Sequence, residues 1–473
     1  MDKDFIGRKQ EIDTLKSIMK SGRPEFVAVY GRRRVGKTFL IQQFFDNKFT
    51  FAATGIIDGN KKEQFHSFYK SLKNAGYKGK LPETWLEAFD ILASTIENYG
   101  TRGRKVVYID ELPCFDTPKS GFVRALGYFW NSWASTRKDV VLIVCGSATS
   151  WIVDYIFNNR AGLHNRLTHR IYLRQFSLSE TEKYLKSRGF KWKRQMILNA
   201  YMMLGGVPYY LSLLDCKLSL AQNIDHIYFE DGAELSMEYQ HLYMSLFKMP
   251  EQYVRIVVTL AANKQGMTRN EIANALSIPS SGTLSKQLVS LVNCDIIRRY
   301  VTKARGKIKL KDTYYQLVDL FSLFHLSFAN KNAFLDFWEQ NAKTAAVRTW
   351  LGLAFEHVCN VHFRQIRSAL GLDRIAVEYY SWRSKEPPRA QIDMVIERAD
   401  GLANICEIKY SSSPYVITAE QDMKFRNRMA AFANVVSSQL GLVPTWITTY
   451  GLFKNEYSID VQYQVTMDDL FES

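Results

Sequence analysis

The sequence lacks the features that mark secreted, metal-stapled or membrane-spanning chains. Its six cysteines are scattered and form no CxxC pair, so neither a zinc site nor a disulfide framework is expected. No uninterrupted apolar run approaches the roughly 18 residues that cross a bilayer, and the first residues, MDKDFIGR, lack the apolar core of a signal peptide. We therefore expect a protein of the reducing cytoplasm with no membrane partner.

Acidic side chains are also in the minority. The chain has 47 Asp and Glu against 62 Lys and Arg, which gives a formal net charge of +15. This balance favours a polyanionic partner such as nucleic acid, although it also occurs in proteins that only need solubility. Internal repeats and low-complexity tracts are absent, and 473 residues suffice for about three domains of about 150 residues each.

Short apolar runs separated by helical stretches fill the first part of the chain. The candidate strands are residues 25–30, 49–53, 105–109 and 140–145. Continuous apolar runs of this kind are typical of strands that are buried on both faces of a parallel sheet. We therefore expect an α/β fold, followed from about residue 177 by helices that open with a serine cap in SLSETEKYL.

A glycine-rich loop follows the first of these strands. Residues 31–38 read GRRRVGKT and precede the helical run FLIQQFF, which is the strand, loop and helix order of a phosphate-binding P-loop. Backbone N–H groups of such a loop surround phosphates, its lysine reaches the β- and γ-phosphates, and its threonine holds Mg²⁺. The expected ATP-binding residues here are Gly31, Val35, Gly36, Lys37 and Thr38, with ATP and Mg²⁺ as cofactors.

Polar residues follow the last two of these candidate strands. KVVYIDE places Asp110 and Glu111 at a strand end, where Asp110 can orient Mg²⁺ through water and Glu111 can act on the attacking water. An acidic pair in a solvated turn is the alternative. The strand VVLIVC ends before Gly146 and Ser147, where the hydroxyl of Ser147 could sense the γ-phosphate.

Together these motifs resemble the archaeal and bacterial P-loop ATPases close to the AAA+ and STAND classes. The stretches that carry the resemblance are FIGRKQEIDTL at 5–15, GRRRVGKT at 31–38, YIDE at 108–111, CGS at 145–147 and GGVPYYL at 205–211. The resemblance implies that Ile6, Arg8 and Pro208 lie on the adenine side of the nucleotide.

The same resemblance draws attention to the loop NNRAGLHNRLTHRIYLRQF. It implies that Arg166 or Arg170 approaches the γ-phosphate, either in the same chain or from a neighbouring subunit of a homo-oligomer. Ordinary surface arginines are an equally open alternative.

Residues 250–310 change character. Three helical segments, RIVVTLAANKQG, MTRNEIANALSI and SGTLSKQLVSLVNCDIIRRY, precede the basic stretch VTKARGKIKLK, an order that resembles a winged helix-turn-helix. Alternate positions on a strand share one face, so the hairpin would align a stripe along DNA phosphates: Lys303, Arg305, Lys307, Lys309 and Lys311. The alternative is a regulatory lid with solvated lysines.

The last 130 or so residues return to a mixed α/β pattern. QIDMVIERADGLANICEIKY resembles the PD-(D/E)xK signature of restriction-endonuclease-like domains. The resemblance implies that Asp393 and Glu407 hold Mg²⁺, that Lys409 orients or activates the attacking water, and that Glu356 of LAFEHVC is a further metal ligand. Gln421 could assist. A loose pattern on ordinary amphipathic strands is the alternative.

Strand parity gives a test of this last site. A two-residue hairpin at Asp400 and Gly401 would place Asp393 opposite Ile408 and turn Glu407 to the wrong face. A three-residue loop, Ala399 to Gly401, places Asp393 opposite Glu407. We therefore predict the three-residue loop, with Gly401 in a left-handed conformation.

These observations lead to one hypothesis and two rivals. The expected domains are an ATPase core at 1–176, a helical lid at 177–240, a winged helix at 241–330 and a nuclease-like domain at 331–473. The leading hypothesis is an ATPase that binds DNA and cuts it with the C-terminal domain. The rivals are a STAND-like switch whose C-terminal domain recruits a partner, and an ATP-dependent transcription regulator.

Overall fold

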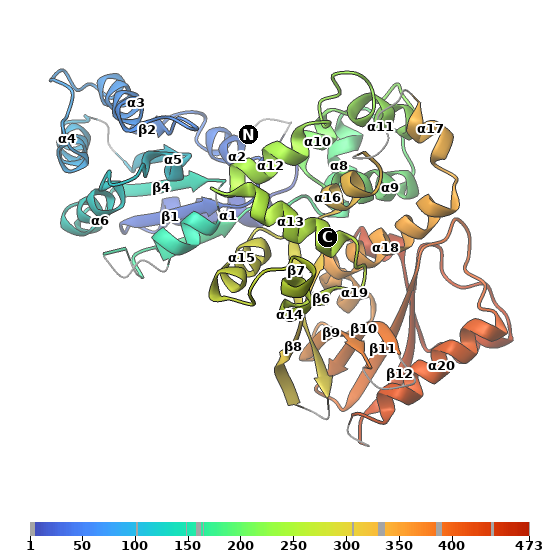
Figure 1. Ribbon diagram of the computed structural model, residues 1–473. Helices are drawn as coiled ribbons and strands as arrows, with labels where there is room; N and C mark the ends of the chain where they lie inside the picture. The colour runs from blue at the N-terminus through green and yellow to red at the C-terminus, as the bar shows by residue number, and fades with distance from the viewer. Residues whose placement is uncertain are drawn as a thin grey trace. The chain divides into compact units, whose positions relative to one another are not determined.

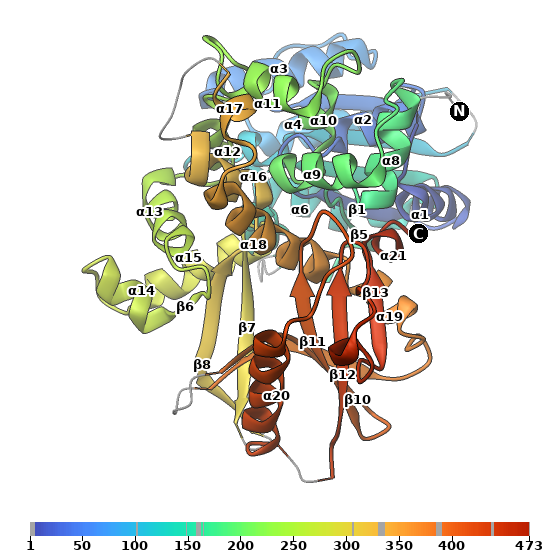
Figure 2. The same ribbon diagram turned by 90° about the vertical axis from the view of Figure 1, so that its right-hand side faces the viewer.

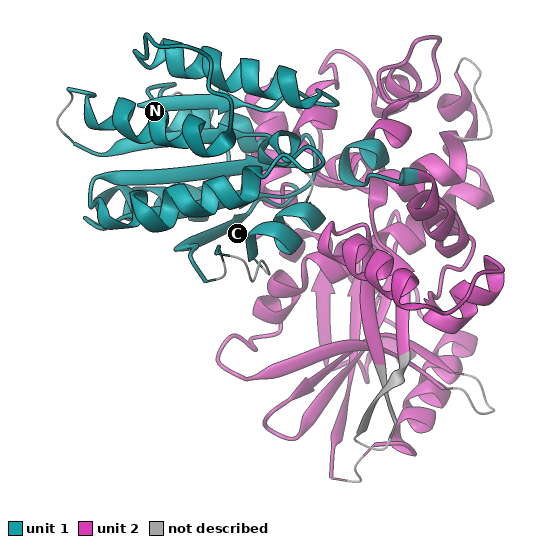
Figure 3. Cartoon of the chain, turned by 60° about the vertical axis from the view of Figure 1, so that its left-hand side comes forward, with its two compact units in different colours: residues 1–175, 242–250 teal, residues 176–241, 251–473 magenta. Residues whose placement is uncertain are grey.

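The computed structural model (Figure 1) describes residues 5–100, 103–147, 149–157, 162–163, 165–304, 307–329, 336–384, 390–436 and 439–472, with the backbone alone at 302–304 and 307–312. The chain forms two compact units, coloured separately in Figure 3: unit 1 comprises residues 1–175 and 242–250, and unit 2 comprises residues 176–241 and 251–473. Among the helices described, none is long and apolar enough to cross a membrane.

Unit 1 is built on a five-stranded parallel sheet in the order β2-β3-β4-β1-β5. The strands are β1 (Glu25–Tyr30), β2 (Phe51–Thr54), β3 (Lys105–Asp110), β4 (Val140–Gly146) and β5 (His169–Tyr172). The predicted parallel sheet is confirmed, and each predicted strand is present. β5 was not predicted, because its sequence HRIY begins with two polar residues and does not form an apolar run.

Helices cover both faces of this sheet. On β4, Val144 packs in one apolar cluster with residues such as Leu126, whereas its neighbour Ile143 packs in the other with Leu15. Successive side chains of a strand point to opposite faces, so both faces of the sheet are buried, which explains the continuous apolar runs. The helices of unit 1 are α1 (Lys9–Lys20), α2 (Lys37–Phe44), α3 (Lys61–Asn74), α4 (Trp85–Glu97), α5 (Leu112–Phe115), α6 (Phe122–Ser132), η1 (Ala134–Thr136), α7 (Thr149–Ile152) and η2 (Val153–Phe157).

Unit 2 opens with a helical layer. Its first helix starts at the predicted serine cap, because Ser177 and Glu180 form a reciprocal capping box. The helices are α8 (Leu178–Ser187), α9 (Arg194–Leu204), α10 (Pro208–Ser212) and α11 (Leu220–Tyr228), and α12 (Glu238–Leu246) follows them along the chain.

Three helices and a hairpin come next, in the predicted order. They are α13 (Pro250–Ala261), α14 (Arg269–Ala275), α15 (Gly282–Asn293), β7 (Ile297–Ala304) and β8 (Lys307–Leu317), with β6 (Met267–Thr268) paired to β8. Arg305 lies outside the described residues. For Lys303, Lys307, Lys309 and Lys311 the backbone alone is described, so the stripe stays a prediction.

Aromatic side chains join the helical layer of unit 2 to its last part. Phe324 stacks edge-on to Trp338 at 4.9 Å and to Trp350 at 5.4 Å between ring centroids, and Tyr210 packs on Phe321 at 4.7 Å. The helices involved are α16 (Leu320–Phe324), η3 (His325–Ala329), α17 (Phe337–Asn341), α18 (Ala345–Val361) and α19 (Phe363–Ala369).

A second five-stranded sheet ends the chain, in the order β13-β12-β11-β10-β9. Its antiparallel strands are β9 (Val377–Arg383), β10 (Gln391–Arg398) and β11 (Leu402–Lys409), and β12 (Gly441–Thr448) and β13 (Tyr463–Thr466) continue it in parallel. The helix α20 (Ala419–Ala433) lies along one face (Figure 2) and packs Phe425 and Phe432 against it. α18 packs against β11, and η4 (Glu456–Ser458) and α21 (Met467–Leu470) complete the chain.

Two buried histidines make unit 2 sensitive to acid. His362 accepts a hydrogen bond from the Leu178 N–H at 3.0 Å and directs Nδ1 to the Val358 carbonyl at 2.9 Å, an arrangement that requires a neutral ring. Burial lowers the pKa of His362 to about 4 and that of His357 to about 3. Unfolded histidine titrates near 6.5.

We predict that His357 and His362 each contribute a loss of unit 2 stability as the pH falls from about 6.5 toward 4. In this window the unfolded state binds protons that the folded state does not, so the free energy of unfolding decreases with falling pH. His357→Leu is the test, because Nδ1 of His357 has no hydrogen-bond partner among the described residues. Urea unfolding is measured at pH 7 and at pH 5. The decrease in the free energy of unfolding between these two pH values should be smaller in His357→Leu than in wild type by about 2 kcal/mol. His66→Leu, which replaces an exposed ring, is the control, and an unchanged difference in His357→Leu would contradict the prediction.

Candidate functional site

The predicted P-loop connects β1 to α2. Gly31 has φ +143°, and a Cβ atom there would lie 2.3 Å from the Leu173 carbonyl oxygen, so this close approach requires glycine. Gly36, with φ 91°, caps the N-terminus of α2, whose first residue is Lys37. The strand, loop and helix order predicted from the sequence is therefore confirmed, and the positive end of a helix dipole faces the loop.

The ammonium group of Lys37 is buried within this loop. It donates to the carbonyls of Gly31 at 3.0 Å and Arg32 at 2.9 Å, and to Ser147 Oγ at 3.1 Å. Burial lowers its pKa, since a desolvated cation is disfavoured. The acceptors that hold the ammonium here are weaker than phosphate oxygens, so a phosphate at the loop would replace them as the hydrogen-bond partner of Lys37.

Thr38 and Asp110 lie beside the lysine. The Thr38 hydroxyl donates to Asp110 Oδ2 at 2.8 Å, and Asp110 Oδ1 accepts the Glu111 N–H at 2.9 Å. Asp110 ends β3 and is 4% exposed. A hydroxyl and a carboxylate are hard oxygen donors of the kind that Mg²⁺ takes alongside water and phosphate, so these residues fit the predicted ion.

Ser147 connects Lys37 with Glu111. Its hydroxyl accepts from Lys37 and donates to Glu111 Oε1 at 3.1 Å, and its N–H donates to Glu111 Oε2 at 3.4 Å. Glu111 has φ 44°, a strained conformation for a residue with a side chain. A series of hydrogen bonds thus connects Lys37, through Ser147, to Glu111, the carboxylate that was predicted to act on water.

The remaining ATP-side predictions are only partly placed. Arg8 donates to the Val35 carbonyl at 2.9 Å and so contacts the P-loop, while Ile6 is half-buried nearby in sequence. Pro208 begins α10 of unit 2. Arg166 is exposed, and the Arg170 guanidinium lies 4.3 Å above the Phe157 ring. The adenine-side and γ-phosphate roles of these residues stay predictions.

The second candidate site lies on β10 and β11. Met394 pairs with Cys406 and Glu397 with Ala403, and this register leaves a three-residue loop with Gly401 at φ +84°. The predicted loop is confirmed. The register places Asp393 in line with Glu407, on the strand face that α20 covers.

Charged groups meet at this point of the sheet. Glu407 is 3% exposed and accepts from the Lys409 ammonium at 2.7 Å and from the Arg428 guanidinium. Asp393 Oδ2 accepts the Ile408 N–H at 3.2 Å. Burial and the neighbouring Glu407 raise the pKa of Asp393 to about 6, and burial and Asp393 raise that of Glu356, on α18, to about 8.

Arg428 was missed in the sequence, although a signal was available. It falls between Phe425 and Phe432 on α20, three and four residues away, so it belongs to the apolar stripe that faces the sheet. A cation in such a stripe needs a buried partner. Gln421, by contrast, caps α20, where its Oε1 accepts the Thr418 N–H at 3.1 Å.

The donor set on β10, β11 and α18 fits a hard divalent cation. Its carboxylates supply oxygen ligands suited to Mg²⁺ or Mn²⁺, and a positive charge here would counteract the burial and the carboxylate neighbours that raise the pKa values of Asp393 and Glu356. Asp393, Glu407 and Glu356 are all among the described residues, but their ligand atoms do not all lie within 4.8 Å of one another. A metal ion would have to draw them closer.

The acidic group that does meet this distance is Asp225, Asp336 and Glu339. Asp225 accepts the Trp338 N–H at 2.7 Å and the Glu339 N–H at 2.9 Å. Its carboxylate therefore caps the start of α17, and the cluster has a structural explanation.

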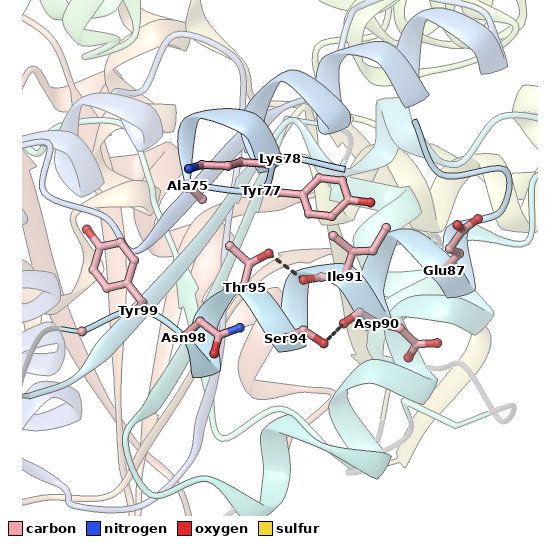
Figure 4. A pocket seen from close by; sticks show the side chains of 12 residues that line it. Ala75, Tyr77, Lys78, Glu87, Asp90, Ile91, Ser94, Thr95, Asn98 and Tyr99 are labelled. Atoms are coloured by element: carbon pink, nitrogen blue, oxygen red, sulfur yellow. Dashed lines mark hydrogen bonds between the residues drawn. The ribbon is translucent and has the colours of Figure 1, made fainter. Parts of the chain in front are cut away.

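A groove of about 720 Å³ lies between the end of α3 and α4 (Figure 4). Its serine and threonine hydroxyls bond to their own helix, since Thr95 donates to the Ile91 carbonyl at 2.7 Å and Ser94 to the Asp90 carbonyl at 3.1 Å. None of the P-loop residues lines it, so it is separate from the phosphate site.

The fold and phosphate site of unit 1 define a P-loop ATPase domain. Residues 5–214 match the family of ATPase domains found predominantly in Archaea, so this part of the chain is an archaeal-type P-loop ATPase domain. ATP binding and hydrolysis are the activities of this class.

Three individual proteins are similar to the chain. An uncharacterized protein of Methanocaldococcus jannaschii is 24% identical over 357 residues, which cover 75% of this chain and 76% of the relative. An uncharacterized ATP-binding protein of the same organism is 43% identical over 44 residues, 9% of this chain and 75% of the relative. The solved Walker-type ATPase of Pyrococcus abyssi has 17% identity and a TM-score of 0.48, covering 68% of this chain and 96% of its own.

We predict that Ser147→Ala separates ATP binding from hydrolysis. The substitution keeps the P-loop and the Thr38 hydroxyl but removes the hydroxyl that joins Lys37 to Glu111. The Kd for ATP should change little, and phosphate release should slow by roughly tenfold to hundredfold. Ser132→Ala, which removes an exposed hydroxyl bonded to its own helix, is the control. Hydrolysis at the wild-type rate would show that Ser147 does not position Glu111.

Proposed function

We propose that this ATPase binds DNA through α15 and the β7–β8 hairpin and cleaves it at the carboxylates of β10 and β11. The observation that supports cleavage best is the strand register, which brings Asp393, Glu407 and Lys409 to one face through the three-residue loop. An acid pair and a lysine on neighbouring strands are what metal-assisted attack on a phosphodiester requires.

The division of labour within unit 1 follows from its contacts. Lys37 would leave the loop carbonyls for the β- and γ-phosphates, Thr38 and Asp110 would hold Mg²⁺, and Glu111 would accept a proton from the water that attacks the γ-phosphorus in line with the departing ADP. Mg²⁺ would neutralise the charge that develops on the phosphate oxygens.

The second site is proposed to act on a phosphodiester. Asp393, Glu407 and Glu356 would hold a divalent cation, which lowers the pKa of water and polarises the phosphate. Lys409, whose ammonium lies 2.7 Å from Glu407, would orient the attacking water. DNA would be held by the basic stripe Lys303, Arg305, Lys307, Lys309 and Lys311 on the proposed wing.

A nucleotide-controlled switch is the second candidate function, and one observation favours it. Glu407 is already paired with two cations, Lys409 and Arg428. A carboxylate compensated in this way is stable without a metal ion, as a recruiting domain with no catalysis would require. The ATPase unit would then control access of a partner to unit 2 instead of DNA cleavage.

We predict that plasmid cleavage depends on Lys409 and not on neighbouring surface lysines. Purified full chain is incubated with supercoiled plasmid and Mg²⁺ or Mn²⁺, with and without ATP. Lys409→Ala should reduce nicking by at least about hundredfold and keep ATP hydrolysis, whereas Lys37→Ala should abolish hydrolysis. Lys424→Ala, which removes an exposed ammonium on α20 paired with Glu420, is the matched control.

The outcomes separate the two candidate functions. Cleavage that is lost in Lys409→Ala but kept in Lys424→Ala supports the nuclease. If the wild-type chain cuts no DNA with either metal, with or without ATP, the nuclease proposal fails and the switch is favoured.

We predict a separate signature for the basic stripe. Replacing Lys303, Lys307, Lys309 and Lys311 by glutamine should weaken DNA binding and reduce the slope of log Kd against log salt concentration by about 3 to 4, because each phosphate contact releases counterions. The control replaces four exposed lysines of α3, Lys61, Lys62, Lys70 and Lys73, and changes the net charge equally. Equal slopes for the two variants would show that DNA does not contact the hairpin.

A further inference from the structure

An arginine of the β7–β8 hairpin reaches the C-terminal sheet. β7 packs beside β9 (Figure 1), and Arg298 of β7 reaches across this contact. Its guanidinium donates to Ser381 Oγ of β9 at 2.9 Å and to Asn360 Oδ1 of α18, while Nε donates to Gln316 Oε1 of β8 at 2.7 Å. A planar fork with fixed donors holds three elements in one geometry.

The first partner of Arg298 controls the backbone at Asp393. Ile392 pairs with Trp382, but the next pair is Val395 with Tyr380, so Asp393 and Met394 oppose Ser381 alone. This is a β-bulge, which re-aims the side chain of the bulged strand. Ser381 Oγ donates to the Asp393 carbonyl at 2.8 Å, and Arg298 holds the same hydroxyl.

The second partner, Asn360, connects Arg298 to the backbone of Glu356, the other buried acid. Asn360 Nδ2 donates to the Glu356 carbonyl at 2.7 Å, one turn earlier on α18, and Asn360 Oδ1 accepts from Arg298. One guanidinium thus connects, through one residue each, to the backbone of Asp393 and of Glu356.

Burial lowers the pKa of Arg298, and the nearby carboxylates of Glu356 and Asp393 act in the opposite direction. Its neighbour Arg299 is exposed on the same strand. Arg298 itself is half-buried, and of these two neighbouring arginines it is the one that contacts Ser381 opposite the bulge.

We propose that Arg298 is a positioning residue of the candidate metal site: through Ser381 and Asn360 it fixes the backbone that carries Asp393 and Glu356, so that divalent-metal affinity depends on the β7–β8 hairpin. This inference rests on the proposed metal site of the previous subsection. Residues that orient metal ligands from behind change metal affinity by about tenfold to hundredfold when they are removed.

The test is Mn²⁺ binding by the full chain. Binding is measured by calorimetry and by the electron paramagnetic resonance signal of free Mn²⁺. Arg298→Gln and Ser381→Ala should each weaken binding by about tenfold to hundredfold. The double variant should bind no more weakly than the weaker single variant, because both substitutions break one chain of contacts. Arg298→Lys keeps the charge but loses the fork, and should bind more weakly than wild type. Arg299→Gln, the matched charge change, should bind as wild type does.

The outcomes also distinguish this inference from the proposed site. If wild type and all variants bind no Mn²⁺, the proposed metal site fails and the inference fails with it. If wild type binds Mn²⁺ and both Arg298→Lys and Ser381→Ala bind within about twofold of it, the metal site stands and the role of Arg298 is wrong. Should Arg298→Gln fail to fold, the Arg298→Lys and Ser381→Ala variants decide the question.

Discussion

In unit 1, the parallel register of β1, β4 and β3 brings the residues that follow each strand to one edge of the sheet. Tyr30 is level with Gly146, and Ile109 with Val144. The P-loop, Ser147 and the acidic pair after Ile109 must therefore emerge beside one another. The buried ammonium of Lys37 then finds acceptors on two of these segments. Helix α2, the strained Glu111 and the Mg²⁺-compatible pair of Thr38 and Asp110 all depend on that register.

In unit 2, antiparallel strands also bring polar groups together, but here the length of the loop between β10 and β11 places them. One loop residue decides whether Glu407 faces α20 or the other side of the sheet, because a shift of one position moves every side chain of a strand to the other face. The bulge at Asp393 then interrupts the pairing with β9 while the pairing with β11 stays regular from Met394 onward. The turn therefore places Asp393 and Glu407 on one face, and contacts with the β7–β8 hairpin set the orientation of Asp393.

The sequence was sufficient wherever the determinants are local. Apolar runs predicted four strands of unit 1, glycine spacing predicted the P-loop, and parity predicted the loop before β11. It was insufficient where a side chain finds its partner through tertiary packing. Arg298 lies 62 residues from Asn360 and 83 from Ser381, and Arg428 lies 21 residues after Glu407. No periodicity connects such positions, and β5 was missed because polar residues interrupt its apolar pattern.

The charge balance around Glu407 is what separates a catalytic site from a structural one. The Glu407 side chain is 4% exposed, whereas those of Lys409 and Arg428 are 33% and 28% exposed. A divalent cation entering beside Asp393 would meet two positive groups, so binding requires at least one of them to withdraw toward solvent. Arg428 can do so by a side-chain rotation on α20, while Lys409 shares the strand of Glu407. A nuclease would use this exchange, because the released guanidinium is free to bind a phosphate, whereas a switch would keep the pair closed.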